Sequence, residues 1–262
     1  MRVLILKDYE KACKWATEYI IQRINAFAPS AKKPFVLGLP TGSSPLGIYR
    51  QLVAACKGKK ISFSNVVTFN MDEYLGLPAD HPESYKRFMK DNLFSGIDIK
   101  SKNTHILDGM TKDPEKECMA YEAAIKAAGG IELFLGGIGN NGHIAFNEPG
   151  SSLNSRTRVV TLTSDTRKVN ARFFNNDPEK VPAQALTVGI GTVMDAREVL
   201  ILVSGRQKAK ALQAAVEGPV SQWCPLSCLQ MHPEAIIVCD EEAAEELKYS
   251  TVKYFEDIEK PN

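Results

Sequence analysis

The sequence lacks the features that nucleic-acid-binding, membrane-spanning and secreted proteins need. Lys and Arg number 32 against 31 Asp and Glu, and the net charge of +1 gives no field that would attract nucleic acid or a membrane surface. No apolar stretch approaches the roughly 20 residues of a membrane span. The apolar run at the N-terminus is also too short for a signal peptide. We therefore expect a soluble, unprocessed cytoplasmic protein with no nucleic-acid or membrane partner.

The sequence also lacks cysteine pairs with the CxxC spacing of metal and redox sites. Its six cysteines are scattered through 262 residues, a chain too long to need disulfides for stability. Cys224 and Cys228 could form half of a metal site, but no second Cys or His pair follows, and His232 alone does not complete one. The sequence predicts reduced thiols and no metal site.

The chain does contain short apolar runs, each leading into a Gly, Pro or acidic turn and then a helical pattern. This alternation is typical of a parallel sheet with helices. The predicted strands are 3–6, 35–39, 65–69, 131–135, 199–203 and 235–238. The predicted helices are 9–27, 45–56, 114–128 and 208–217. We expect a Rossmann-like α/β fold: one domain over 1–262, with a doubly wound, mostly parallel sheet and helices on both faces.

The turn at 40–45 is the first candidate binding site, because ligands of such folds bind where the strands end. Thr41, Gly42, Ser43 and Ser44 stand between a predicted strand and a helix that begins near Pro45. Free amides, hydroxyls and the helix dipole together suit a phosphate. An ordinary Ser N-cap is the alternative. The turn has no P-loop lysine, which argues against a nucleotide triphosphate.

Asp72 and Glu73 lie in the turn that follows the next predicted strand, 65–69. A partly desolvated carboxylate at that place could have the raised pKa that a general base needs. Acidic residues at strand ends are also routine helix caps, and these two residues alone favour that interpretation.

A glycine-rich segment at 137–142 formally matches the dinucleotide motif GxGxxG. We reject a dinucleotide site, because that motif opens a helix and Pro149 and Gly150 arrive within two turns. The segment instead continues into His143 and Glu148. A lone histidine is more often structural, but beside a carboxylate and near a strand end His143 is the best acid–base candidate among the four histidines.

Two basic residues are candidates to bind an anion. Lys208 follows Ser204 and Gly205 in the first turn of a predicted helix, and Arg172 lies in the segment DTRKVNARFF. Both are solvated surface charges by default. Either could instead contact a phosphate held by the first turn.

Several segments together resemble glucosamine-6-phosphate deaminase, in that family's order and over essentially the whole chain. They are LGLPTGSSP, TFNMDEYLGL, HPESY, GGIGNNGHIAFNEPGSSLNSRTR, ALTVGIGTVMDA and ELK…TVKYF. The resemblance implies conversion of glucosamine 6-phosphate to fructose 6-phosphate and ammonia without a cofactor. Such an enzyme is an aldose–ketose isomerase and deaminase, which we expect to fall in the hydrolase class.

The resemblance also implies roles for individual residues. His143, oriented by Glu148, would open the sugar ring, and Asp72 would move a proton from C2 to C1. The phosphate would be held by Thr41, Gly42, Ser43, Ser44, Arg172 and Lys208.

Asn141 departs from the family pattern GxDGHIAFNE, in which an Asp is expected. An anionic Asp beside an imidazole stabilises its protonated form, whereas an amide can select the wrong tautomer. In serine proteases such an Asp→Asn change lowers the rate about 10⁴-fold. We therefore include Asn141 among the catalytic positions and hypothesise a folded, substrate-binding protein with weakened ring opening.

The resemblance further implies a regulated oligomer. It suggests a homohexamer with an activator site for N-acetylglucosamine 6-phosphate between subunits, and a lid at about 162–182. The activator residues would be Ser151, Ser152, Arg158, Thr161 and Tyr254. Val160 replaces an expected basic residue, which should weaken activator binding.

Two other functions stay open at this point. A catalytically weak or silent sugar-phosphate sensor would bind glucosamine 6-phosphate without releasing ammonia, and Asn141 is the argument for it. A hydrolase like 6-phosphogluconolactonase would share the broad fold but leave the amine-specific chemistry unused.

Overall fold

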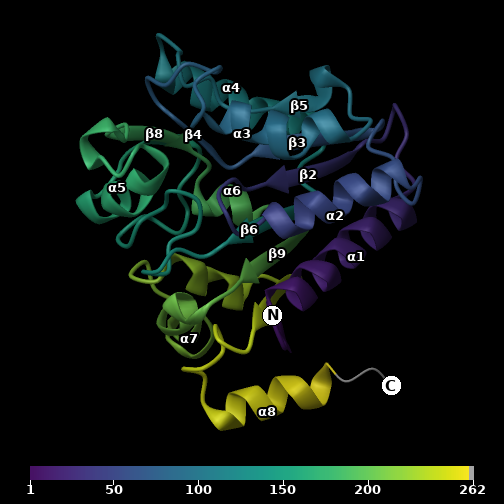
Figure 1. Ribbon diagram of the computed structural model, residues 1–262, viewed down its shortest axis with the longest axis vertical. Helices are drawn as coiled ribbons and strands as arrows, with labels where there is room; N and C mark the ends of the chain where they lie inside the picture. Colours follow the sequence, from purple (N-terminus) through teal and green to yellow (C-terminus); the bar gives the residue numbers. More distant parts are fainter. Residues whose placement is uncertain (260–262) are drawn as a thin grey trace.

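A seven-stranded parallel sheet forms the centre of the computed structural model, which describes residues 1–259 (Figure 1). The strand order is β1-β10-β9-β6-β2-β3-β5, and every neighbouring pair is parallel. The strands are β1 (Arg2–Leu6), β2 (Phe35–Leu39), β3 (Val66–Asn70), β5 (Thr104–His105), β6 (Leu133–Gly137), β9 (Glu198–Val203) and β10 (Ala235–Asp240). The six strands predicted from apolar runs are thus confirmed, with ends shifted by one or two residues in most cases.

Helices cover both faces of this sheet, which confirms the doubly wound prediction. On one face α1 (Tyr9–Phe27), α2 (Leu46–Lys57) and α3 (Tyr85–Asn92) pack in one hydrophobic cluster. The other face packs against α4 (Pro114–Ala127), α6 (Ile190–Met194), α7 (Ala209–Glu217), the 3₁₀ helix η6 (Pro225–Met231) and α8 (Tyr249–Ile258). The apolar stripes of these helices are buried against a sheet whose central strands are buried on both sides.

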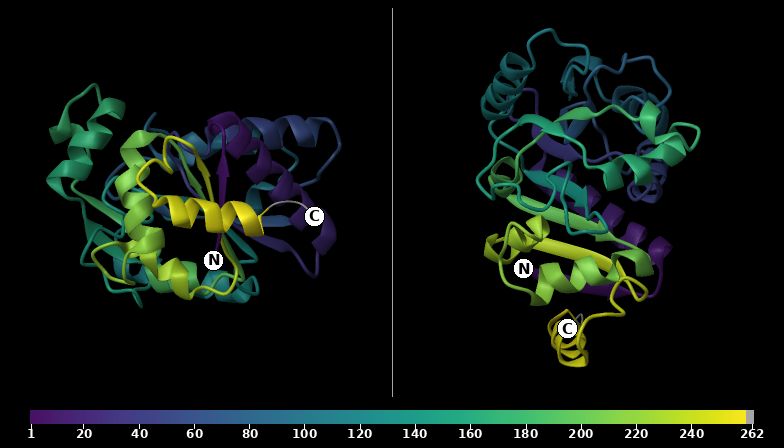
Figure 2. Two further views of the ribbon diagram at one scale, coloured as in Figure 1. Left: turned by 90° about the horizontal axis from the view of Figure 1, so that it is seen from below. Right: turned by 90° about the vertical axis from the view of Figure 1, so that its left-hand side faces the viewer.

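A smaller antiparallel sheet, β4-β8-β7, was not predicted. Its strands are only three or four residues long: β4 (Asp72–Tyr74), β7 (Arg158–Thr161) and β8 (Gln184–Thr187). The connection from β7 to β8 contains α5 (Ser164–Asn170) and the 3₁₀ helices η3 (Ala171–Phe173) and η4 (Pro178–Lys180). This segment stands out from the main sheet (Figure 2). It packs in its own hydrophobic cluster, which includes Tyr74, Phe146 and Phe174.

The direction of chain winding reverses between β2 and β6. From β2 the chain proceeds outward through β3 to β5, and it then returns to the other side of β2 through β6 and β9. Loops after neighbouring strands diverge at such a switch point and leave a crevice at the carboxyl ends of the strands. The turns after β2 and β6 flank it, and both were candidates from the sequence.

The six cysteines are free, and five of them are buried. Within residues 1–259, no helix is both long enough and apolar enough to cross a membrane. The same part of the chain contains no group of three or more His, Cys, Asp or Glu side chains placed to hold a metal ion.

Candidate active site

A cavity of about 890 Å³ lies at the switch point. Its walls come from the loops that follow β2, β3, β6 and β9, and from the α5–η3 segment. The predicted residues that line it are Thr41, Gly42, Ser43, Ser44, Asp72, Asn141, His143, Arg172 and Lys208. Glu148 does not line the cavity but contacts Asn141, which does. The structure therefore gathers the predicted active-site residues in one place.

Lys208 and Arg172 place two neighbouring positive charges in the wall of this cavity. Burial and the nearby charge of Arg172 lower the pKa of Lys208 to about 8. Within residues 1–259, neither side chain forms an ion pair with a carboxylate. Two neighbouring cations without a counter-ion are costly unless an anion joins them, so this part of the cavity is suited to a phosphate.

The turn after β2 faces these cations with unused donors. The N-cap of α2 is Pro45, and no side chain caps that helix. The alternative that a serine of this turn is an ordinary N-cap therefore finds no support. Gly42 has a φ of 90°, which glycine adopts at little cost. The first amides of α2 are already bonded, Leu46 N to Ser43 O at 3.4 Å and Gly47 N to Tyr9 Oη at 2.9 Å. Within residues 1–259, the N–H groups and hydroxyls of Ser43 and Ser44 donate to no group, so the donors that can bind an anion are those of the turn itself.

Asp72 and Glu73 have separate tasks, although they are adjacent. Glu73 accepts hydrogen bonds from the backbone N–H groups of Tyr74, Tyr85 and Lys86 at 2.9–3.0 Å. It thereby caps the first turn of α3 together with the N-cap residue Ser84. Asp72 is 7% exposed, and burial and the charge of Glu73 raise its pKa to about 8. No group within residues 1–259 donates a hydrogen bond to the Asp72 carboxylate. The helix-cap interpretation holds for Glu73, while Asp72 has the properties of a general base.

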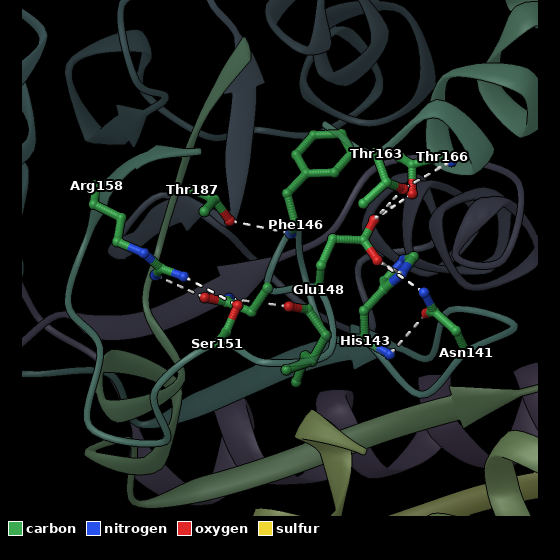
Figure 3. A network of polar contacts seen from close by, with 11 residues as sticks. Asn141, His143, Phe146, Glu148, Ser151, Arg158, Thr163, Thr166 and Thr187 are labelled. Atoms are coloured by element: carbon green, nitrogen blue, oxygen red, sulfur yellow. Dashed lines mark hydrogen bonds and ion pairs between the residues drawn. The ribbon is translucent and has the colours of Figure 1, made fainter. Parts of the chain in front are cut away.

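His143, Glu148 and Asn141 form a contact network after β6 (Figure 3). His143 Nδ1 lies 3.7 Å from Glu148 Oε2, and it is a buried atom without a hydrogen-bond partner in the described chain. Asn141 Nδ2 donates to the same carboxylate oxygen at 2.8 Å, and Asn141 Oδ1 accepts from the His143 backbone N–H at 3.3 Å. The amide of Asn141 thus contacts Glu148 and the His143 backbone.

The Glu148 carboxylate is held in its charged form. Burial alone would raise its pKa, but contacts with His143, Thr166 and Asn141 outweigh that effect and lower the pKa to about 2. An ionised carboxylate at this place can orient the imidazole and stabilise its protonated form. Among residues 1–259, no hydrogen bond joins the Asn141 amide to the imidazole ring. An effect of Asn141 on the imidazole would therefore act through Glu148 or through the His143 backbone.

The backbone around His143 requires two of the glycines noted in the sequence. A Cβ atom at Gly139 would lie 2.2 Å from the His143 ring, and Gly142 has a φ of 88°. Hydrogen bonds from Gly139 N to His143 O and from Gly142 N to Gly139 O close a tight turn. No helix begins in this segment, as we inferred when rejecting a dinucleotide site.

Sequence reasoning missed Thr163 and Thr166. The Thr166 hydroxyl donates a short hydrogen bond to Glu148 Oε1, and the Thr163 hydroxyl lies 3.5 Å from the same atom. Thr163 also caps α5 by accepting from Thr166 N at 3.2 Å. A threonine before a helix signals a cap. Nothing in the local pattern signals the contact with Glu148.

The predicted activator residues are not gathered in one chain. Arg158 donates to Ser151 Oγ at 3.3 Å and to Asn147 Oδ1 at 2.8 Å, and burial lowers its pKa. Ser152 and Thr161 belong to the same region, the loop before β7 and β7 itself. Tyr254, however, is exposed on α8, which packs beside β1 at the opposite end of the molecule (Figures 1 and 2). A site using all five residues would need Tyr254 from a second copy.

Residues 7–238 match the family described as Glucosamine-6-phosphate isomerases/6-phosphogluconolactonase. The match covers most of the chain. The chain belongs to this family. Proteins named glucosamine-6-phosphate deaminase are 62% identical in Porphyromonas gingivalis, over 100% of both chains, and 56% identical in Proteus mirabilis, over 99% of this chain and 97% of that one.

Solved structures agree with the family assignment. A protein described as a monomeric glucosamine-6-phosphate deaminase has a TM-score of 0.89 and 41% identity, over 94% of this chain and 100% of that one. The 6-phosphogluconolactonase from Trypanosoma cruzi has a TM-score of 0.75 but only 20% identity, over 94% and 97% of the two chains. The second likeness shows a shared fold alone.

Proposed function

We propose that this protein converts glucosamine 6-phosphate and water to fructose 6-phosphate and ammonia. The observation that carries the proposal is the cavity itself, which combines the unpaired cations Lys208 and Arg172 with the buried base Asp72 and with His143. The family membership and the names of the 56–62% identical relatives support the same activity.

In this proposal the substrate is bound mainly through its phosphate. Lys208, Arg172 and the turn from Thr41 to Ser44 bind it in the cavity. The phosphate takes no part in the chemistry, so its binding energy can be used to position the sugar carbons against the reacting side chains.

His143 is the residue we assign to ring opening. It takes the proton from the anomeric hydroxyl and returns one to the ring oxygen, which breaks the C1–O5 bond and leaves an aldehyde at C1. Glu148 lies 3.7 Å from His143 Nδ1 and supports the protonated imidazole that forms between these two transfers.

Asp72 is the residue we assign to the isomerisation. It removes the proton from C2, which is acidified by the new carbonyl, and delivers it to C1 on the same face of the sugar. A proton also passes from the amine to the C1 oxygen, which becomes a hydroxyl, so the nitrogen is then an imine at C2. Addition of water and loss of ammonia give the C2 ketone of fructose 6-phosphate. Because the C–N bond is broken by water, the overall reaction has the character of a hydrolysis as well as an isomerisation.

We further propose that Asn141 supports turnover. It donates a hydrogen bond to Glu148 and thereby helps to hold that carboxylate ionised beside His143. An aspartate there would instead place a second negative charge against Glu148. Weakened ring opening stays the alternative prediction, and the Asn141→Asp variant distinguishes the two.

Regulation, assembly and location remain predictions of the family resemblance. The α5–η4 segment borders the cavity and packs in a hydrophobic cluster of its own, which supports a lid at about 162–182. An activator site at Ser151, Ser152, Arg158, Thr161 and Tyr254 would need at least two subunits, since α8, which carries Tyr254, packs beside β1, whereas β7 packs beside β8 and α4. The proposed hexamer would supply them, although one relative is described as monomeric. A cytoplasmic location is expected with a sugar-phosphate substrate.

The test is the release of ammonia from glucosamine 6-phosphate by the purified protein, with fructose 6-phosphate formed in equal amount. Release of both products is expected. Binding of glucosamine 6-phosphate without ammonia would indicate a sensor, and hydrolysis of 6-phosphogluconolactone without deamination would indicate a lactonase.

A further inference from the structure

Both carboxylate oxygens of Glu148 accept a hydrogen bond, each from a different segment of the chain (Figure 3). On one side, its Oε2 atom accepts from Asn141 and faces His143. On the other side, its Oε1 atom accepts from the Thr166 hydroxyl, with Thr163 at 3.5 Å. Thr166 and Glu148 are both largely buried, so water does not readily replace this contact. The orientation of Glu148 therefore depends on α5 as well as on the loop that carries His143.

The segment that carries Thr166 also carries Arg172. Helix α5 runs directly into η3, and the Ala171 N–H still bonds to the carbonyls of Arg167 and Lys168. Thr166 and Arg172 both line the cavity. Because a continuous stretch of helical backbone joins them, a movement of the backbone at Arg172 would be passed on to Thr166.

We infer that Thr166 is a positioning residue, through which an anion bound at Arg172 fixes Glu148 beside His143. The inference rests on the proposed function, since it makes the substrate phosphate the anion and ring opening the step that benefits. Phosphate binding would settle α5 against the cavity, and the Thr166 hydroxyl would then keep Oε2 of Glu148 turned toward the imidazole. Binding energy from a non-reacting group would in this way orient the reacting one.

Three variants separate the contact of Thr166 with Glu148 from its role in the structure of α5. The N-cap bond of α5 uses the backbone N–H of Thr166, so removal of the hydroxyl leaves it in place. Thr166→Val preserves the shape of the side chain but cannot donate to Glu148, whereas Thr166→Ser retains the donor. Ser164→Ala removes an exposed hydroxyl from the same helix and is the matched control.

The first measurement is steady-state deamination. Thr166→Val should lower kcat about tenfold with little change in KM, as expected for loss of one hydrogen bond to a charged group. Thr166→Ser should stay within about twofold of the original kcat, and Ser164→Ala should match it. An unchanged kcat in Thr166→Val, or an equal loss in Thr166→Ser, would overturn the inference.

The second measurement needs no turnover. The chain has four histidines, and the ring nitrogen signals of His143 can be assigned by NMR with a His143→Gln variant. Adding inorganic phosphate should shift these signals in the original chain and in Thr166→Ser but not in Thr166→Val. The inference would be contradicted if phosphate did not shift the His143 signals in the original chain. It would also be contradicted if phosphate still shifted them in Thr166→Val. If the coupling is present but no ammonia is released, the proposed function fails and the role of Thr166 stands.

Discussion

The seven-stranded sheet and the three-stranded sheet border the same cavity but are built differently. The large sheet is parallel, and its central strands β2, β6, β9 and β10 are buried on both faces. The small sheet is antiparallel, and β7 is only partly buried. Its connecting segment α5–η3 exposes Val169 and Phe173. We therefore expect the large sheet to be the more rigid region, because the small sheet and its helices have fewer buried contacts.

Each sheet contributes part of the proposed machinery. Loops of the large sheet carry the turn from Thr41 to Ser44, His143 and Lys208, while the small sheet and its connection carry Asp72 and Arg172. A sugar phosphate in the cavity would therefore join the two regions: its phosphate would contact Lys208 on one side and Arg172 on the other. Substrate binding would therefore reduce the motion of the small sheet and its α5–η3 connection relative to the large sheet.

The largest expected effect is that of Asp72→Asn in the small sheet. Loss of the general base should lower kcat by about 10² to 10⁴ and leave KM nearly unchanged. Ammonia release under saturating substrate measures this effect, and a thermal unfolding scan controls for folding. Turnover within tenfold of the original would show that another residue moves the proton.

Lys208→Met and Arg172→Met compare the two regions directly. Each should raise KM about 10- to 100-fold, because each removes a charge-assisted contact with the phosphate. Lys210→Met, at an exposed position of the next helix, is the matched control and should have no effect. If Lys208→Met alone raises KM, the phosphate is held by the large sheet only and the two regions are not joined by it.

The pH dependence of kcat/KM should also report on one group from each region. Asp72 must be ionised, and its pKa is raised to about 8. Lys208 must be protonated, and its pKa is lowered to about 8. The rate constant should therefore rise toward pH 8 and fall above it. Lys208→Arg should remove the fall on the alkaline side, since a guanidinium stays charged there. A profile that is flat between pH 6 and roughly 9 would contradict both assignments.

The smallest expected effect is that of Asn141→Asp. This substitution lies in the loop that follows β6 of the large sheet and does not alter the small sheet. We expect kcat to stay the same or to fall by a few-fold, because the new carboxylate would repel that of Glu148 and raise the pKa of one of the two. The measurement is ammonia release at saturating substrate. A tenfold gain in kcat would restore the hypothesis that Asn141 weakens ring opening.

Sequence patterns predicted the large sheet better than the small one, for physical reasons. Strands such as β2 and β9 are buried on both faces, so they form continuous apolar runs that stand out in the sequence. The strands β4, β7 and β8 have three or four residues each and mix polar and apolar side chains. So short a pattern cannot be distinguished from a loop.

The same limit applied within the site. Asp72 and Glu73 are adjacent acids that no local pattern separates. Their tasks differ because the N-terminus of α3, 12 residues further along, meets only Glu73. Likewise, the contact of Thr166 with Glu148 joins residues 18 positions apart. The types of residue in the site could be predicted from sequence, but their partners depend on the tertiary fold.

The most direct test of the two-region account is a crystal structure of the Asp72→Asn variant with glucosamine 6-phosphate. The account predicts a phosphate within hydrogen-bond distance of Lys208, Arg172 and the turn from Thr41 to Ser44. It also predicts that C1 and C2 lie beside position 72, with the ring oxygen near His143. A sugar phosphate bound only to loops of the large sheet, or only near Ser151 and Arg158, would contradict it.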